Sequence, residues 1–87
     1  MEKRLFKYNH FAYAVLCHES GYSMWAYNTG SPDRNAPPYY FLGSVKGGVL
    51  ESIKMTDRLP WDIYKGMERL YRRVMVDLSN GVRYDGS

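Results

Sequence analysis

The chain has 87 residues, of which 45% are hydrophobic, 16% aromatic and 24% charged. This length accommodates one hydrophobic core and excludes a second core of independent stability. The 12 basic and 9 acidic residues give a net charge of +3, which excludes a histone-like, polybasic protein. We therefore expect a single compact domain over residues 1–87.

Cysteine content and hydropathy bear on the cellular compartment. Cys17 is the single cysteine of the sequence, so neither an internal disulfide nor a cysteine-based zinc site is available. The basic N-terminus is not followed by the apolar segment that a secretory signal needs. The longest apolar stretch, residues 11–17, is too short to span a bilayer. We expect a cytoplasmic protein that makes no membrane contact.

The first third of the chain has two interpretations. Residues 11–18 and 22–28 are rich in strand-forming side chains and predict a hairpin that turns at Ser20-Gly21. The pairs in that register are Cys17–Met24, Val15–Ala26 and Leu16–Trp25. Alternatively, apolar residues in steps of three and four from Leu5 to Leu16 trace a helical stripe that Gly21 ends. The content of Tyr, Val and Phe favours the hairpin.

Residues 29–38 read TGSPDRNAPP and predict a loop, because Gly, Pro and Asn interrupt regular structure. A loop of this length is unusual in so small a domain, and long loops often carry function. Asp33 and Arg34 in this loop are therefore candidate binding residues.

A second hairpin is predicted from residues 39–45 and 49–55, which are rich in aromatic and β-branched side chains. A tight turn at Gly47-Gly48 would connect the two strands. The pairs in this register are Leu42–Ile53, Tyr40–Met55 and Ser44–Glu51. The apolar pairs then share one face of the sheet, which supports the hairpin.

The segment Pro60–Leu78 predicts an amphipathic helix, since its apolar residues recur at helical spacing. Pro60 suits the first turn, and Asn80-Gly81 is a typical helix stop. Gly66 costs about 1 kcal/mol relative to Ala in a helix interior and would permit a close approach to the sheet. The apolar stripe consists of Ile63, Tyr64, Met67, Leu70, Tyr71, Val74, Met75 and Leu78. Residues 82–87 are expected to form a flexible tail.

These elements predict a small α+β fold in which an antiparallel sheet of about four strands, in two hairpins, packs against one C-terminal amphipathic helix. The helical interpretation of the first third instead gives the order α-β-β-β-α. That order is similar to a double-stranded-RNA-binding domain. Where that family begins its second helix with Lys-Lys-x-Ala-Lys, this chain reads Leu59-Pro60-Trp61-Asp62-Ile63. The main phosphate contacts of the family are missing, so we do not assign the chain to it.

No residue pattern points to catalysis or to a metal. Cys17 and His18 lie near His10 and Glu19 in the sequence, but adjacent strand residues point to opposite faces. Their spacing also matches no zinc site. The glycines from Gly43 to Gly48 lack the Gly-Lys-Ser/Thr ending of a phosphate-binding loop. We therefore expect a protein that is not an enzyme and has no cofactor.

The aromatic residues divide between a core and a surface. If Tyr13 and Met24 point inward from the first hairpin, then Leu16, Trp25 and Tyr27 point outward. One of the neighbours Tyr39 and Tyr40 must point outward as well. The aromatic residues expected in the core are Phe41, Tyr64, Tyr71 and Tyr13. Exposed aromatics beside arginine are enriched at protein interfaces and also stack on nucleic-acid bases.

Basic residues cluster at the N-terminus and along the predicted helix, where Arg69 and Arg73 lie one turn apart. We expect a non-enzymatic protein that docks on a larger macromolecule and blocks or recruits it. The candidate binding residues are Trp25, Tyr27, Asp33, Arg34, Tyr39, Arg69 and Arg73. In size and composition the chain resembles the accessory proteins with which phages inhibit host enzymes or immune systems. That resemblance implies an inhibitor of a host or defence protein.

The alternative function is binding of nucleic acid or a small nucleotide through tyrosines and the basic helix face. The two functions differ in salt dependence, because phosphate binding weakens steeply with added salt. A homodimer is compatible with either function, since small domains with an exposed aromatic sheet face gain stability by association.

Overall fold

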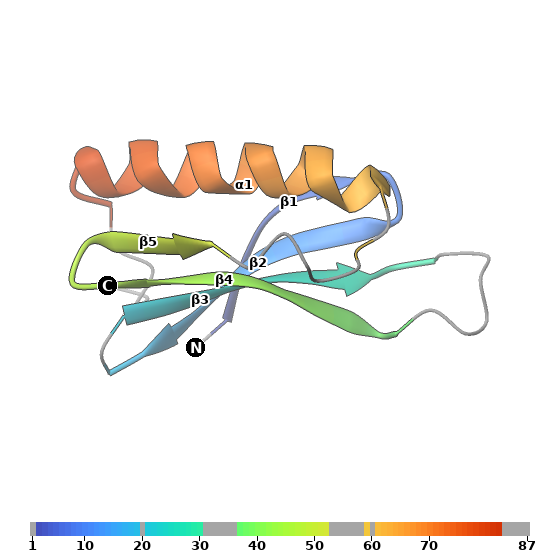
Figure 1. Cartoon of the computed structure of the whole chain (residues 1–87), viewed down its shortest axis with the longest axis horizontal. Coiled ribbons are helices and arrows are strands. Elements are labelled where there is room, and N and C mark those ends of the chain that lie inside the picture. The colour runs from blue at the N-terminus through green and yellow to red at the C-terminus, as the bar shows by residue number, and fades with distance from the viewer. Residues whose placement is uncertain (1, 20, 31–36, 53–58, 60, 83–87) are drawn as a thin grey trace.

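The computed structural model describes residues 2–19, 21–30, 37–52, 59 and 61–82. It has two layers, an antiparallel sheet and one helix that crosses one face of the sheet (Figure 1). The elements are β1 (Glu2–Tyr8), β2 (Phe11–His18), β3 (Gly21–Asn28), β4 (Tyr39–Lys46), β5 (Val49–Ser52) and α1 (Trp61–Ser79). The strands lie side by side in chain order. The expected α+β class, with a C-terminal helix on an antiparallel sheet, is confirmed.

The sheet has five strands where about four were expected, because β1 forms an additional edge strand. β1 pairs with β2 from Glu2↔Leu16 to Tyr8↔Phe11, and Leu5 is an extra residue at a bulge. This pairing stacks Phe6 on Tyr13 with ring centroids 5.0 Å apart. The helical interpretation of residues 5–18, and with it the α-β-β-β-α order, is therefore wrong. Apolar residues from Leu5 to Leu16 recur in steps of three and four because the bulge at Leu5 interrupts the simple alternation of a strand.

The first hairpin is confirmed, but its register differs by two residues from the expected one. Val15 pairs with Met24 and Leu16 with Ser23, so β2 ends at His18 and β3 begins at Gly21. A shift of two residues leaves every side chain on its expected face. Gly21 belongs to β3 because it pairs with His18 on one side and Lys46 on the other, and a side chain is not accommodated there. A Cβ at this position would lie 1.9 Å from the Val45 carbonyl oxygen.

The second hairpin has the expected register. Ser44 pairs with Glu51, and Lys46 pairs with Val49 across Gly47-Gly48. The predicted partners at positions 53 and 55 lie outside the described residues. So do residues 31–36 of the predicted loop and residues 83–87 of the predicted tail. At the base of the loop, the Asn28 N–H donates to the Pro38 carbonyl at 2.9 Å.

Helix α1 runs from Trp61 to Ser79 and ends as the sequence predicts. The Gly81 N–H donates to the Leu78 carbonyl and the Val82 N–H to the Asp77 carbonyl, which is a Schellman cap. The predicted apolar stripe faces the sheet, with Ile63, Gly66, Leu70 and Val74 buried. Met75 is the exception, since 40% of it is exposed.

The core lies between α1 and the inner face of the sheet. Its fully buried large side chains are Tyr13, Val15, Met24, Leu42, Val45, Ile63, Leu70 and Val74. Phe41, which was expected in this core, is instead 46% exposed on the opposite face. A bulge between β3 and β4 pairs Met24 with Gly43 and Trp25 with Phe41, which places Phe41 outward beside Trp25. One face of the sheet therefore carries the core, and the other carries aromatic side chains.

Candidate docking surface

The outer face of the sheet, opposite α1, carries a continuous group of aromatic side chains. Cross-strand pairing places Trp25 between Ala14 and Phe41, and the next outward position places Tyr27 beside Tyr39. We call Leu16, Trp25, Tyr27, Tyr39 and Phe41 the aromatic surface. Its members come from β2, β3 and β4, so the central strands of the sheet hold it rigidly in place.

The rings of the aromatic surface contact one another edge to face. The centroid of Trp25 lies 5.2 Å from that of Phe41 and 5.5 Å from that of Tyr39, at interplanar angles of 67° and 73°. Such pairs contribute about 0.5–1.5 kcal/mol beyond their buried area. A hollow of about 170 Å³ opens between Leu16, Trp25, Tyr27 and Tyr39. The surface is therefore ordered before any partner binds and presents a shallow depression for an apolar side chain.

Small residues make room for these rings. Ala12 and Ala14 lie on the outer face, directly across from Tyr27 and Trp25, yet they are only 6% and 0% exposed. No described helix or strand covers this face (Figure 1), and the neighbours of the two alanines across β3 are the large rings of Tyr27 and Trp25. Larger residues at positions 12 and 14 would lift the rings away from the sheet.

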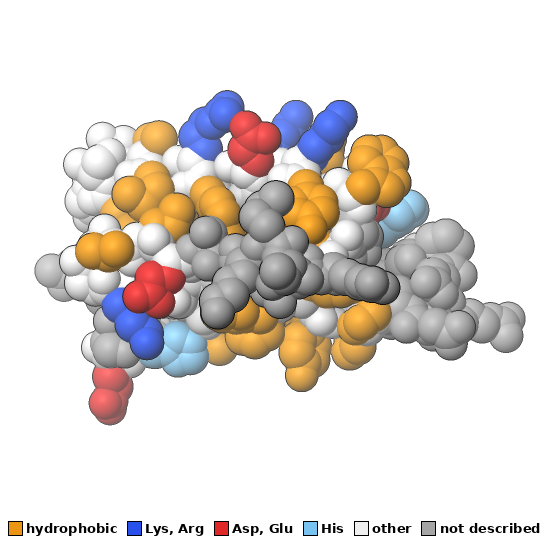
Figure 2. All heavy atoms as spheres, viewed as in Figure 1, with side chains coloured by type: hydrophobic (Ala, Val, Ile, Leu, Met, Phe, Trp, Pro, Cys, Tyr) orange, Lys and Arg blue, Asp and Glu red, His pale blue; other side chains and the backbone are white. Residues whose placement is uncertain are grey.

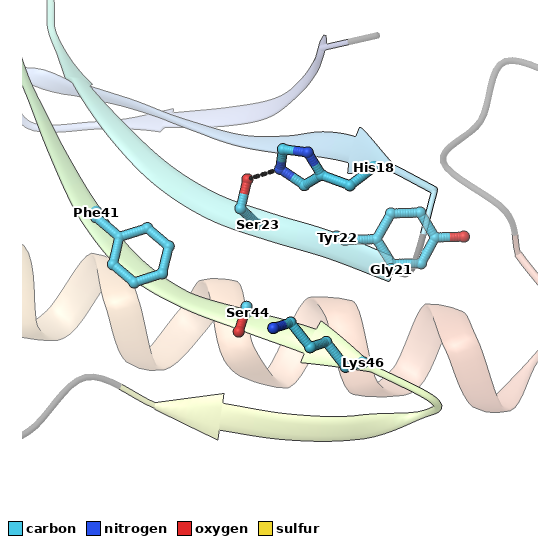
Figure 3. A pocket seen from close by; sticks show the side chains of 7 residues that line it. All are labelled: His18, Gly21, Tyr22, Ser23, Phe41, Ser44 and Lys46. Carbon is cyan, nitrogen blue, oxygen red and sulfur yellow. Dashed lines mark hydrogen bonds between the residues drawn. The ribbon is translucent and has the colours of Figure 1, made fainter.

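A hydrogen-bond chain fixes the orientation of Trp25. Its indole Nε1–H donates to the Ser23 hydroxyl oxygen at 2.7 Å, and this oxygen lies 2.8 Å from Nε2 of His18. Figure 3 shows His18 and Ser23 on the same side of the sheet as Phe41, Ser44 and Lys46. These side chains line a hollow of about 360 Å³ that has both polar and apolar walls and adjoins the aromatic surface at Phe41. Ser23 is buried and accepts a bond from Trp25, which makes it a support for the indole rather than an accessible nucleophile.

The hydrogen bonds between His18, Ser23 and Trp25 were not expected from the sequence. The expected register paired Leu16 with Trp25, whereas the observed register pairs Leu16 with Ser23. In the expected register His18 lies directly opposite Ser23, and in the observed register it lies diagonally from Ser23, because His18 pairs with Gly21. Both registers leave the two side chains on the same face of the sheet. The one sequence signal for these hydrogen bonds is the small polar residue Ser23 between the large side chains of Tyr22 and Met24 in β3.

Charges of both signs surround the aromatic surface. The Arg4 guanidinium lies 5.5 Å from the Tyr27 ring centroid and 3.8 Å from a carboxylate oxygen of Glu2. Burial raises the pKa of Tyr27 above its usual 10.0, and the negative charge of Glu2 and a hydrogen bond with Glu2 raise it further. Lys46 lines a hollow together with Phe41, and Glu51 in β5 pairs with Ser44, which lines the same hollow. The rim is therefore mixed in charge rather than uniformly basic.

The structure brings together three of the seven candidate binding residues, Trp25, Tyr27 and Tyr39. It adds Phe41 and Leu16 to them. Arg69 and Arg73 lie on α1, in the other layer. Figure 2 shows Lys and Arg side chains along the helix edge of the molecule and hydrophobic side chains along the opposite edge. Asp33 and Arg34 lie outside the described residues.

The described residues hold no group of three or more His, Cys, Asp or Glu side chains placed to bind a metal ion. His10 follows β1 and His18 ends β2, so the length of β2 separates the two histidines. Cys17 packs against the core, whereas His18 contributes to the outer face. In the described part of the chain, no helix combines the length and apolar character that a membrane-spanning segment requires.

Comparison of the chain with models of protein families, with curated proteins and with solved structures finds no match in any of the three.

Proposed function

We propose that this is a non-enzymatic binding protein that docks on a larger protein through the aromatic surface and so blocks or recruits it. The observation that carries the proposal is the contiguity of Trp25, Tyr27, Tyr39 and Phe41 on a sheet face that no described element covers. Tyr39 and Phe41 are 54% and 46% exposed, although the rings of both contact Trp25. Contiguous exposed apolar patches mark interaction sites.

The chemistry of the patch favours a protein as the partner. Protein interfaces combine an aromatic centre, rich in Trp and Tyr, with a polar rim of mixed charge. The rim here contains Arg4 and Lys46 beside Glu2 and Glu51. Two carboxylates balance two cations in this rim, so it offers the phosphates of a nucleic acid no net attraction. A partner with an apolar side chain for the hollow beside Trp25 and polar groups around it fits better.

A photo-crosslinking experiment tests the proposal. A benzophenone amino acid replaces Phe41 in one variant and Val76, which is 52% exposed on α1, in a matched control. Each protein is irradiated in lysate of the cells from which the gene comes. We expect position 41 to crosslink a discrete protein and position 76 not to do so. Excess unlabelled wild-type chain should suppress the adduct, whereas excess Tyr39→Ser chain should not.

Three outcomes would contradict this function. One is a crosslink of equal yield at positions 41 and 76, and another is an adduct that Tyr39→Ser chain suppresses as well as wild type does. The third is an adduct with the mass of a second copy of this chain, which would identify the aromatic surface as a homodimer interface. Because Tyr39 is exposed at a strand end, its replacement is expected to leave the fold intact, which circular dichroism verifies.

A further inference from the structure

A second surface lies where β1 meets α1, in the layer opposite the aromatic surface. The Arg69 guanidinium lies over the ring of Tyr8, with its central carbon 4.6 Å from the ring centroid. A hollow of about 290 Å³ opens on one side of Arg69, and one of about 300 Å³ opens on the other. Lys65 and Arg72 line the first hollow, and Lys7 and Arg73 line the second. We call Lys7, Lys65, Arg69, Arg72 and Arg73 the basic seam.

The positive charges of the seam exceed the nearby negative ones. Arg72 pairs with Glu68 at 3.2 Å, and Arg73 pairs with Asp77 at 3.3 Å. No carboxylate in the described part of the chain forms an ion pair with Lys7, Lys65 or Arg69. Five cations against two carboxylates leave a local charge of +3, equal to the net charge of the whole chain. The seam therefore carries a net positive charge.

The Tyr8 ring prepares Arg69 for an anion. A guanidinium that lies over a ring uses its flat face for the cation–π contact and keeps the N–H donors at its edge available. Among the described residues, none accepts a hydrogen bond from Arg69 in the structure. The contact restricts the side chain in advance, so less conformational entropy is lost when those donors bind an oxyanion.

The spacing of the seam fits a chain of phosphates better than a single one. Lys65, Arg69 and Arg73 follow one another at intervals of four residues on one side of α1. At 1.5 Å per residue each step is about 6 Å, and the row extends for about 12 Å. Consecutive phosphates of a nucleic acid strand are separated by a similar distance, whereas one phosphate would occupy only one of the two hollows.

We propose that the basic seam binds the sugar–phosphate backbone of a nucleic acid, with Arg69 as its central contact. This site is separate from the aromatic surface and does not depend on the function proposed for that surface. A protein with both sites would hold a protein partner on one layer and a nucleic acid on the other.

Fluorescence anisotropy with a short labelled RNA or DNA, single-stranded or duplex, tests the site between about 50 and about 200 mM salt. We expect wild-type binding to at least one of these probes, with affinity that falls linearly in a plot of log K against log salt concentration. Arg69→Gln should weaken binding by about tenfold at low salt and reduce the slope by about one, because one phosphate contact is lost. Lys46→Gln removes the same charge from the outer face and should change neither value.

Arg69→Lys provides a second test, since lysine keeps the charge but loses the planar guanidinium and its several N–H donors. It should restore the salt slope and only part of the affinity. The absence of binding at the lowest salt would overturn the proposal. So would equal effects of Arg69→Gln and Lys46→Gln, which would indicate attraction by net charge alone. Displacement of the probe by polyglutamate at equal charge concentration, or tighter binding to phosphatidylserine vesicles, would assign the seam to another acidic partner.

Discussion

The side chain of Tyr13 places a polar hydroxyl inside the apolar core. Tyr13 is fully buried, and its hydroxyl oxygen has no hydrogen-bond partner among the described residues. A buried polar group without a partner costs about 1–3 kcal/mol in desolvation. Burial, followed by the negative charge of Asp62 and the influence of Tyr8, raises the pKa of this phenol from 10.0 to about 12. The missing hydrogen bond and the raised pKa both indicate that the Tyr13 hydroxyl is neutral and lies in an apolar site.

Tyr13→Phe should therefore stabilise the protein at neutral pH by about 1 kcal/mol, since it removes a hydroxyl that gains no bond on folding. Above pH 10 the unfolded chain releases the Tyr13 proton while the native state keeps it. The free energy of unfolding of wild type should then fall as pH rises from 10.0 to about 12, and the variant should show a smaller fall. Urea titrations at neutral and alkaline pH measure both effects, and a less stable variant at neutral pH would contradict the first.

At the scale of the elements, the distance between α1 and the sheet depends on Gly66. A Cβ at this position would lie 1.9 Å from the Tyr13 hydroxyl oxygen and 2.1 Å from the ring carbon that bears it. The expectation that Gly66 permits a close approach is thereby confirmed. The helix loses about 1 kcal/mol of propensity to Gly, and the close packing of the two layers compensates for it.

Gly66→Ala should consequently destabilise the protein, although the same change stabilises an exposed helix by about 1 kcal/mol. Overpacking of a filled core typically costs about 1–3 kcal/mol, and here a rigid ring occupies the space. Thermal unfolding followed by circular dichroism measures the effect. Glu68→Ala, on the solvent side of α1, is a matched control that should shift the midpoint little. A Gly66→Ala protein with a higher midpoint than wild type would show that the layers are not in close contact.

At the scale of the whole molecule, the sheet separates two surfaces of different chemistry. The aromatic surface lies on the outer face, and the basic seam lies beside the helix on the other side. Desolvation of apolar rings depends weakly on salt, whereas phosphate contacts depend on it strongly. The two proposed binding events are therefore distinguishable in one titration series.

We expect Tyr39→Ser to abolish the protein crosslink and leave nucleic-acid affinity unchanged, and Arg69→Gln to do the reverse. The reason is distance, because substitutions that share no partner usually act additively. The double variant should then lose both activities by the amounts of the single variants. A loss of nucleic-acid binding in Tyr39→Ser would instead place both ligands on one continuous surface.

Local patterns in the sequence were sufficient for much of this architecture. Periodicity and turn chemistry predict the helix with its Gly81 stop and the hairpin at Gly47-Gly48. Alternation along the strands predicts which side chains of the first hairpin point inward and which point outward. These features depend on neighbours within a few residues. The outward direction of Trp25 and Tyr27 is an example, since alternation along one strand determines it.

Tertiary pairing decided what local patterns left open. Bulges and contacts between strands decided three features. These are the presence of β1, the two-residue difference in the register of the β2–β3 hairpin, and the outward position of Phe41. The layering of strands and helix brings four aromatic side chains into one surface, namely Trp25, Tyr27, Tyr39 and Phe41. The same layering places Arg69 on the other side. No single segment carries that information, because each of these sites exists only where residues far apart in the chain are packed together.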